Sequence, residues 1–399
     1  GATATGGFNS SYPATNLFNG TLSDSSRAEG NDNDGVIEVV FSPGISVSST
    51  VGIWSGKSSV AYQINDSGSY TTYSDAVGSF KDISFTGTLT NLKIKHGSSG
   101  NAPGASGIRV DGTTLLDGTG PGLKFQPDFL WIKSRSSGTE GHYLANSVSG
   151  LTKNMRSNRT NAEQTNTNGV TAANANGFTL GDSGRVNGSS QAYAGWIWDA
   201  GSSTVTNTDG SISSQVRASQ TAGFSIVSFT AGSSGSLGHG LNTEPSVVIF
   251  KNRDTAGKWR FYHKDVGTSK TLFLNTNEAE TSSSEYVTAV SSSTFTVTGT
   301  ISGDDHIAYC LAPVANYSSM GSYTGSGSAD GPFVFTGFKS KWILIKVSST
   351  TNDWVIYDTE RDTYNASDAE LYPNTSGAEN TSGPIDILSN GFKQRSTHN

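Results

Sequence analysis

The chain has 399 residues, of which 15% are charged and 48 are glycine, and its formal net charge is −7. An acidic chain without clustered Lys and Arg gives no basis for nucleic-acid binding, and no apolar stretch is long enough to be inserted in a membrane. The single cysteine, Cys310, excludes an internal disulfide framework and is expected to be a buried, inert thiol.

Residues 1–118 are predicted to form one N-terminal jelly-roll domain. Short runs that alternate apolar and polar residues recur about every ten positions, which is typical of an antiparallel sandwich or jelly roll. The Asp-Gly pair at 111–112 lies between two such runs and predicts a two-residue hairpin turn. The predicted strands are 36–41, 45–47, 51–54, 60–64, 80–85, 91–95, 107–110 and 113–116.

One loop of this domain is a candidate metal site. The run NDNDG at 31–35 places several oxygen ligands beside a glycine turn, and calcium prefers oxygen ligands. The run lacks the bidentate glutamate of an EF-hand, so an ordinary solvated turn is favoured. A structural calcium ion at Asp32 and Asp34 is the alternative, and no other cofactor is predicted.

From residue 119 onward one signature occurs twice in full and once in part. GLKFQPDFLWIKSR at 122–135 aligns with GLNTEPSVVIFKNR at 240–253, and FKSKWILIK at 338–346 aligns with FQPDFLWIK at 125–133. Repetition at this spacing predicts tandem copies of one all-β module. The predicted β-sandwich repeats, joined by short Gly/Ser linkers, are 119–202, 203–317 and 318–399.

Two landmarks recur in register after each lysine of the signature. An Ala-Glu pair follows the lysine by about 30 residues, and a phenylalanine follows that pair. A glutamate present in every repeat is expected to anchor a turn rather than to act as one of the two facing acids of a glycosidase. The landmarks are Glu163, Glu280 and Glu379, and then Phe178, Phe295 and Phe392.

The third repeat lacks a closing aromatic strand. AYAGWIW at 192–198 closes the first repeat and HIAYCLA at 306–312 closes the second, whereas few residues follow Phe392. The third sandwich is therefore expected to leave the donors and acceptors of one strand edge unpaired. Two explanations are open: the chain is cut short, which we favour, or a partner chain supplies the strand.

Several segments resemble known phage proteins. WVIYDT at 354–359, AENT at 378–381 and LSNGF at 388–392 resemble a repeat of marine, cyanophage-like bacteriophage virion proteins that are often described as tail fibres. NLFNG at 16–20 and TGTLTNLKIK at 86–95 resemble a galactose-binding-like jelly roll that precedes such repeats. The resemblance implies a tail-fibre or adhesion component on the virion surface, and it brings no catalytic motif.

The expected partners follow from that resemblance. They are other virion proteins, host surface carbohydrate, and further copies of the chain, with a homotrimer as the first guess. The protein is predicted not to be an enzyme, because its histidines lie in no nucleophile motif. Two other functions stay open: a capsid decoration or other purely structural virion protein, and a virion-associated glycan depolymerase.

Tryptophans are the candidate ligand-binding residues. Trp196 and Trp198 point to one face of a predicted strand in the first repeat. Trp259 of the second repeat and Trp354 of the third occupy positions equivalent to each other. Indole faces stack against the C–H groups of sugars, so repeated tryptophans can form carbohydrate platforms. The alternative, which we favour, is that each tryptophan fills the core of its own sandwich.

Overall fold

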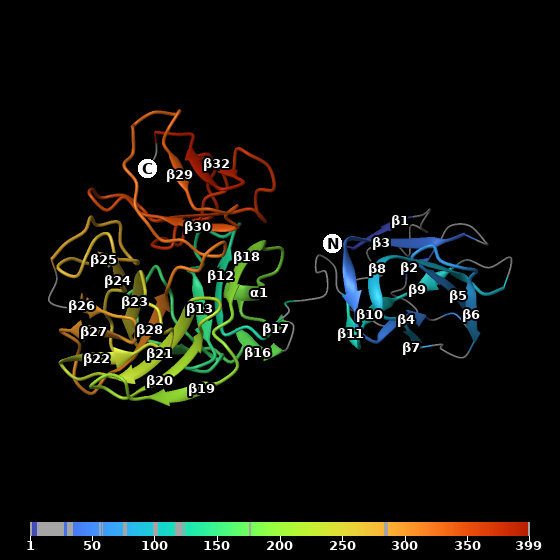
Figure 1. The fold of residues 1–399 in the computed structure, drawn as a ribbon, viewed down its shortest axis with the longest axis horizontal. Coiled ribbons are helices and arrows are strands. Elements are labelled where there is room, and N and C mark those ends of the chain that lie inside the picture. The colour runs from blue at the N-terminus through green and yellow to red at the C-terminus, as the bar shows by residue number, and fades with distance from the viewer. Residues whose placement is uncertain are drawn as a thin grey trace. The chain divides into compact units, whose positions relative to one another are not determined.

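The protein is all-β, as predicted, and it divides into two compact units, residues 1–124 and 125–399 (Figure 1). In the described part of the chain the one helix is α1 (Gly184–Asn187), and no helix there has the length and apolarity of a membrane span. The computed structural model describes residues 2–5, 28–29, 35–55, 57, 59–74, 78–98, 103–115, 123, 125–174, 177–282 and 286–397.

The first unit is a β-sandwich. One antiparallel sheet has the order β1-β3-β8-β5-β6, the other has the order β11-β10-β4-β7, and side chains such as Val39, Leu92 and Ile108 fill the core. Its strands are β1 (Ala2–Thr5), β2 (Ala28–Glu29), β3 (Ile37–Val47), β4 (Thr50–Ser55), β5 (Ser59–Ile64), β6 (Thr71–Ser74), β7 (Ser79–Ser84), β8 (Gly87–His96), β9 (Gly104–Ala105), β10 (Gly107–Val110) and β11 (Thr113–Thr114).

The predicted strands and the predicted turn of this unit are confirmed. The runs 36–41 and 45–47 form one strand, β3, whose register shifts between Val40 and Ile45. Asp111 and Gly112 form the two-residue turn between β10 and β11, both with the positive φ that such a turn requires. The resembling segment at 16–20 lies outside the described residues.

The second unit contains the three repeats. Its strands are β12 (Phe129–Ser134), β13 (Tyr143–Asn146), β14 (Lys153–Asn154), β15 (Gln164–Thr165), β16 (Val170–Asn174), β17 (Gly177–Leu180), β18 (Tyr193–Trp198), β19 (Thr204–Asn207), β20 (Ser214–Ser219), β21 (Phe224–Thr230), β22 (Ser234–Gly238), β23 (Val247–Asn252), β24 (Arg260–His263), β25 (Leu272–Phe273), β26 (Tyr286–Val290), β27 (Thr294–Thr298), β28 (Asp305–Leu311), β29 (Phe333–Phe335), β30 (Trp342–Ile345), β31 (Val355–Asp358), β32 (Ile385–Leu388) and β33 (Gly391–Gln394).

The strand pairing repeats along this unit. In the first repeat β12 lies between β13 and β18, and in the second β23 lies between β24 and β28. A hairpin follows in each repeat, β16–β17, β26–β27 and β32–β33, and Phe178, Phe295 and Phe392 occupy matching places on its second strand. Matching pairing and matching landmarks are what tandem copies of one module require.

The central strands of the first two repeats, β12 and β23, are buried on both faces, because the two faces of each strand contact two different cores. In β12, Leu130 and Ile132 contact a core that belongs to the first repeat alone, whereas Phe129 and Trp131 contact a core to which all three repeats contribute. This explains the continuous apolar run, since a strand with one wet face would alternate polar and apolar residues. The other two repeats divide their central strands in the same way. In β23, Val248 and Phe250 contact the core of the second repeat, and Val247 and Ile249 contact the shared core. In β30, Ile343 and Ile345 contact the core of the third repeat, and Trp342 and Leu344 pack against the shared core.

The shared core changes the expected organisation. We expected three sandwiches held apart by linkers, but residues 125–399 form one compact unit, and Trp131, Tyr309 and Trp354 belong to a single apolar cluster. In Figure 1 the third repeat, drawn in orange and red, lies against the first two. The three repeats therefore build one compact unit with a common core.

The third repeat has an open edge. Its central strand β30 pairs with β31, and no strand in the described residues pairs with the other edge of β30. The first and second repeats place β18 and β28 at this position. The predicted absence of a closing strand is thus found in the described part of the third repeat.

Candidate functional site

The tryptophans that the sequence marked as ligand platforms are core residues. Trp259 is 0% exposed, Trp354 is 2% exposed and Trp196 is 8% exposed, and Trp198 is half-buried against the same cluster. A sugar ring cannot stack on an indole whose faces are covered by other side chains. The platform interpretation is therefore wrong for Trp196, Trp259 and Trp354. They are core residues, but they lie in the core that all three repeats share and not, as expected, each in the core of its own sandwich.

The buried aromatic positions also join the repeats in a closed cycle of hydrogen bonds. The strand registers place His142 of the first repeat at the position of Trp259 and Trp354. A ring nitrogen of each repeat contacts a backbone carbonyl of the repeat before it, and the first repeat contacts the third. The 2.9 Å contacts are Trp259 Nε1 to Arg156, Trp354 Nε1 to Phe273, and His142 Nε2 to Tyr372.

His142 is held neutral in this cycle. The indole N–H of Trp131 donates to His142 Nδ1 at 2.8 Å, so Nε2 carries the ring proton and donates to the Tyr372 carbonyl. Burial, with a smaller contribution from the nearby Lys133 cation, lowers the pKa of His142 to about 3. The residue therefore replaces a tryptophan as a structural donor, and it is not poised for proton transfer near neutral pH.

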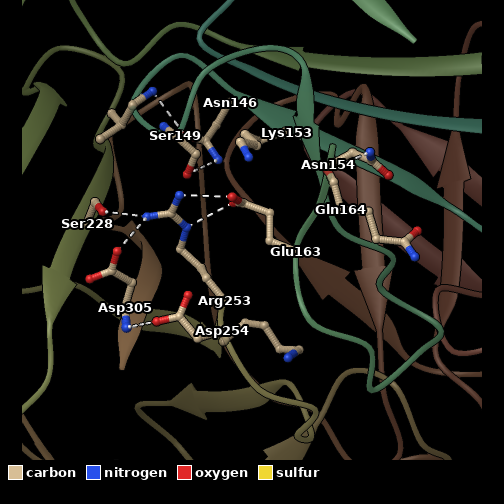
Figure 2. Close-up of polar contacts among 12 residues, drawn as sticks. Asn146, Ser149, Lys153, Asn154, Glu163, Gln164, Ser228, Arg253, Asp254 and Asp305 are labelled. Carbon is tan, nitrogen blue, oxygen red and sulfur yellow. Dashed lines mark hydrogen bonds and ion pairs between the residues drawn. The ribbon is translucent and has the colours of Figure 1, made fainter. Parts of the chain in front are cut away.

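A second cycle uses the landmark glutamates. Arg253, which follows the lysine of the second repeat, donates from Nε and Nη2 to Glu163 of the first repeat, each at 2.9 Å (Figure 2). The Glu163 N–H donates in turn to the Arg253 carbonyl at 2.7 Å. Figure 2 also shows Ser228 and Asp305 on the far side of the same guanidinium. A bidentate pair with little solvent access fixes the two repeats against each other.

The other two junctions show which part of this contact is essential. Arg135 and Glu379 join the first repeat to the third with the same bidentate geometry, at 2.8 and 2.7 Å. Between the second and third repeats Ser348 replaces the arginine, and only the backbone bond from Glu280 to Ser348, at 2.8 Å, is kept. The glutamates are thus structural, as expected, but they anchor neighbouring repeats and not a local turn.

The lysines of the signature are structural too. Each ammonium donates at 2.6 Å to the carbonyl of the next residue. It also donates, at 3.2 to 3.4 Å, to the carbonyl of the residue four positions after the lysine. Burial lowers the pKa of Lys133 and of Lys251 to about 8. Both side chains are fully buried, so these amines satisfy loop carbonyls and are closed to a substrate.

The third repeat departs from the other two at one loop. The loop that follows the second strand is four residues longer there, because nine positions separate the matching landmarks in the first two repeats and thirteen separate them in the third. The landmark pairs are Asn146 and Met155, His263 and Leu272, and Asp358 and Leu371. An insertion in one copy of a repeated scaffold is where a function specific to that copy is expected.

Two side chains hold this longer loop in place. Asp362 Oδ2 accepts the backbone N–H groups of Asp368 and Ala369, both at 2.7 Å. The Asn365 amide makes two bonds to the backbone of Ile387 in β32, donating at 3.0 Å and accepting at 2.8 Å. The loop is therefore anchored to the hairpin of its own repeat.

The anchored loop forms one wall of a surface hollow of about 160 Å³. Tyr364 stands at this hollow with 86% of its surface exposed. Thr359 also lines the hollow and is only 8% exposed. Its buried hydroxyl has no hydrogen-bond partner among the described residues. The lining residues are Lys339, Thr359, Asp362, Thr363, Tyr364, Asn365 and Ile387.

This lining combines an exposed aromatic ring with hydroxyl, amide, carboxylate and ammonium groups. Such a set suits a polyhydroxylated ligand, because a ring face covers sugar C–H groups while short polar side chains bond the hydroxyls. Sequence reasoning missed the hollow. Its signal was present, since Glu379 follows Lys346 by 33 positions whereas Glu163 follows Lys133 by 30.

The candidate calcium loop with Asp32 and Asp34 lies outside the described residues. In the part of the chain that the structure describes, no group of three or more His, Cys, Asp or Glu side chains is arranged to hold a metal ion.

Comparison with known proteins gives one family. A family model described as a domain of unknown function (DUF7483) matches residues 109–399. No curated protein matches the chain. A solved structure titled "Truncated AlyQ with CBM32 and alginate lyase domains" aligns with 78% of this chain and 97% of its own, at 10% identity and a TM-score of 0.21. A similarity that low carries no argument about function.

Proposed function

The chain belongs to the DUF7483 family, whose function is unknown. We propose that this member is a glycan-binding adhesion component on the surface of a bacteriophage virion. The phage assignment rests on the resemblance of the segments at 354–359, 378–381 and 388–392 to virion repeats. The glycan assignment rests on the hollow beside Tyr364. These two parts are independent and are tested separately.

The observation that carries the glycan assignment is the combination of Tyr364 and Thr359. Tyr364 presents an aromatic ring to solvent at the hollow, where a ring face can cover the C–H groups of a sugar. Thr359 lines the same hollow, and its buried hydroxyl has no hydrogen-bond partner among the described residues, so a bond to a ligand hydroxyl would satisfy it. A shallow site of this size suits one sugar ring bound weakly.

Weak sites are effective when they are held in fixed positions. The two contact cycles hold the three repeats of the second unit together, so each of several chains in one virion would present its hollow on the same compact unit. Multivalent contact of this kind raises avidity without a deep pocket in any one subunit.

Glycan-array binding of the purified chain tests the glycan assignment, with release of reducing sugar measured on the same glycans. Binding without release supports adhesion, whereas release supports the depolymerase alternative. Labelling of the chain on intact particles by immunoelectron microscopy tests the virion assignment. Label on the head shell would favour the capsid-decoration alternative.

A further inference from the structure

The first repeat carries an arginine cluster, formed by Arg156, Arg159 and Arg185, that sets it apart from the other two repeats. Arg156 occupies the place of Phe273 and Tyr372, since the backbone carbonyls of these three residues accept the ring N–H groups that join the repeats. The second and third repeats therefore place an aromatic ring where the first places a guanidinium group. The repeated scaffold does not require a cation at this position.

An insertion adds Arg185 to the same repeat. Eighteen positions separate Phe178 from Trp196 in the first repeat, whereas fourteen separate the matching Phe295 and Tyr309 in the second. The longer connection contains α1, and Arg185 lies on it. A substitution and an insertion thus each add an arginine to one copy of the scaffold, which is where a function specific to that copy is expected.

The two guanidinium groups converge on one acceptor. Arg156 donates from Nη2 to Gln164 Oε1 at 2.9 Å, and Arg185 donates from Nη1 to the same oxygen at 3.3 Å. In Figure 2 the Gln164 side chain points away from the ion pair of Glu163 and Arg253, so the arginine cluster is separate from that contact between repeats. An amide oxygen is neutral and offsets neither positive charge.

The arginine cluster has little negative charge beside it. Burial lowers the pKa of Arg156, the Arg185 and Arg159 cations lower it further, and Glu140 alone opposes them. Glu140 lies 3.9 Å from Arg185, and 39% of its side chain is exposed. The Arg159 side chain is exposed and forms no ion pair within the described part of the chain. Three cations therefore gather around one carboxylate, in a chain whose net charge is −7.

This chemistry suits an oxyanion. A guanidinium group is a planar fork that donates parallel N–H bonds to a carboxylate or a sulfate, and each arginine has five N–H groups to offer. One Gln164 oxygen uses a single N–H group of each arginine. The remaining donors are available for a ligand anion at the same place.

The surrounding surface indicates what carries the anion. None of the exposed large apolar side chains of the described residues lies in the first repeat, so this surface lacks the apolar centre of a protein–protein interface. Amide and hydroxyl groups stand beside the arginines along the chain instead, at Asn158, Thr165 and Ser183, and such groups suit sugar hydroxyls. A nucleic acid is disfavoured, because it needs many cations along its phosphates.

We propose that Arg156 and Arg185 bind the carboxylate or sulfate group of an acidic saccharide, and that Arg159 adds electrostatic attraction. Neither binding arginine lines the hollow beside Tyr364. The arginine cluster is therefore a second site, and it goes beyond the proposed function because it requires a charged group that a neutral glycan lacks.

Three trisaccharides of one linkage test the proposal on the full chain by isothermal titration calorimetry. They are trigalacturonate, galactotriose sulfated at each primary hydroxyl, and neutral galactotriose. The chain variants are Arg185→Gln, which removes a binding cation, and Glu140→Gln, which removes the opposing carboxylate. Lys264→Gln is the matched control, since it removes one positive charge from an exposed position in the second repeat.

We expect one or both acidic trisaccharides to bind at least about tenfold more tightly than galactotriose. Arg185→Gln should weaken that binding about tenfold, and Lys264→Gln should leave it unchanged. Glu140→Gln should strengthen it about threefold, because it removes a repelling charge. A purely structural role of the arginine cluster would not give this gain.

The proposal is overturned if neither acidic trisaccharide is preferred to galactotriose, or if the Arg185→Gln protein binds as well as the unsubstituted one. Tighter binding of a ten-residue thymidine oligonucleotide would overturn it as well, because the partner would then be a chain of phosphates. Tyr364→Ala should keep the preference for the acidic probes. Loss of that preference would place the anion at the hollow and refute the assignment to the arginine cluster.

Discussion

Glu163 of the first repeat and Arg253 of the second are joined by three hydrogen bonds, two to the carboxylate at 2.9 Å and one between backbones at 2.7 Å. The residues are 90 positions apart in the chain, and each lies at the same place in its own repeat as Glu379 and Arg135. Their pairing shows that the repeated landmarks are the contacts between repeats. The signature is conserved within this chain because each copy must fit its neighbours.

The first prediction concerns this ion pair. Glu163→Gln should lower the free energy of unfolding by about 3 kcal/mol, because it removes the bidentate carboxylate from the poorly solvated Arg253 cation and leaves only the more distant Asp305, at 3.9 Å, among the described carboxylates. The matched control is Glu280→Gln, at the junction where Ser348 replaces the arginine. Among the described residues Glu280 forms an ion pair with the half-exposed Lys270 alone, so its change should cost less than about 1 kcal/mol. Urea unfolding measures both, and equal losses would refute the assignment.

The second prediction concerns Trp354. Trp354→Ala should cost about 4 kcal/mol through the cavity that it leaves, and Trp354→Phe about 2 kcal/mol, because the Phe273 carbonyl loses its donor. Val205→Ala, at an exposed position of β19, is a control that should change stability by less than about 0.5 kcal/mol. Chemical denaturation of the three variants checks the order. A Trp354→Ala protein as stable as the control would show that the indole is not a core residue.

The third prediction concerns the pH dependence of stability. Burial holds the pKa of His142 at about 3, below its ordinary value of 6.5. Between these pH values the unfolded chain binds a proton that the folded chain does not, so stability falls as pH drops below 6.5, by up to about 1.4 kcal/mol per unit. His142→Gln keeps a donor for Tyr372 but cannot titrate there.

The comparison is the free energy of unfolding at pH 7 and pH 5. The loss between these values should be about 2 kcal/mol smaller in the His142→Gln protein than in the unsubstituted one. Part of the loss will remain, because burial also lowers the pKa of His239, His263 and His306. An unchanged loss would mean that His142 takes up a proton in the folded state.

Much of the fold was accessible from the sequence because its signals are local. The alternation in 36–64, the Asp-Gly turn at 111–112 and the apolar run FLWI each reflect the conformation of a few neighbouring residues. The repeats were visible because matching positions carry matching residues. The open edge of the third repeat followed from the same alignment.

The packing of the repeats against one another was not accessible in this way. Trp259 donates to the carbonyl of Arg156, 103 positions away, and nothing in the local pattern distinguishes a tryptophan in such a shared core from one in a private core or on a surface. The Tyr364 loop was missed for a different reason. Its signal is an insertion relative to the other repeats, and it carries no motif of its own.

The proposed function predicts that Tyr364 carries glycan binding while contributing little to folding, since its side chain is 86% exposed. Tyr317 is the matched control, because it is also an exposed tyrosine, at 57%, and is not a lining residue of the hollow. Tyr364→Ala and Tyr317→Ala should both unfold within about 0.5 kcal/mol of the unsubstituted protein.

The most direct measurement is the affinity of these three proteins for the strongest ligand found on a glycan array. We predict that Tyr364→Ala weakens binding at least about tenfold, as loss of a stacking aromatic ring should, and that Tyr317→Ala leaves it unchanged. Full binding by the Tyr364→Ala protein, with its fold intact, would contradict the assignment of this hollow as the glycan site.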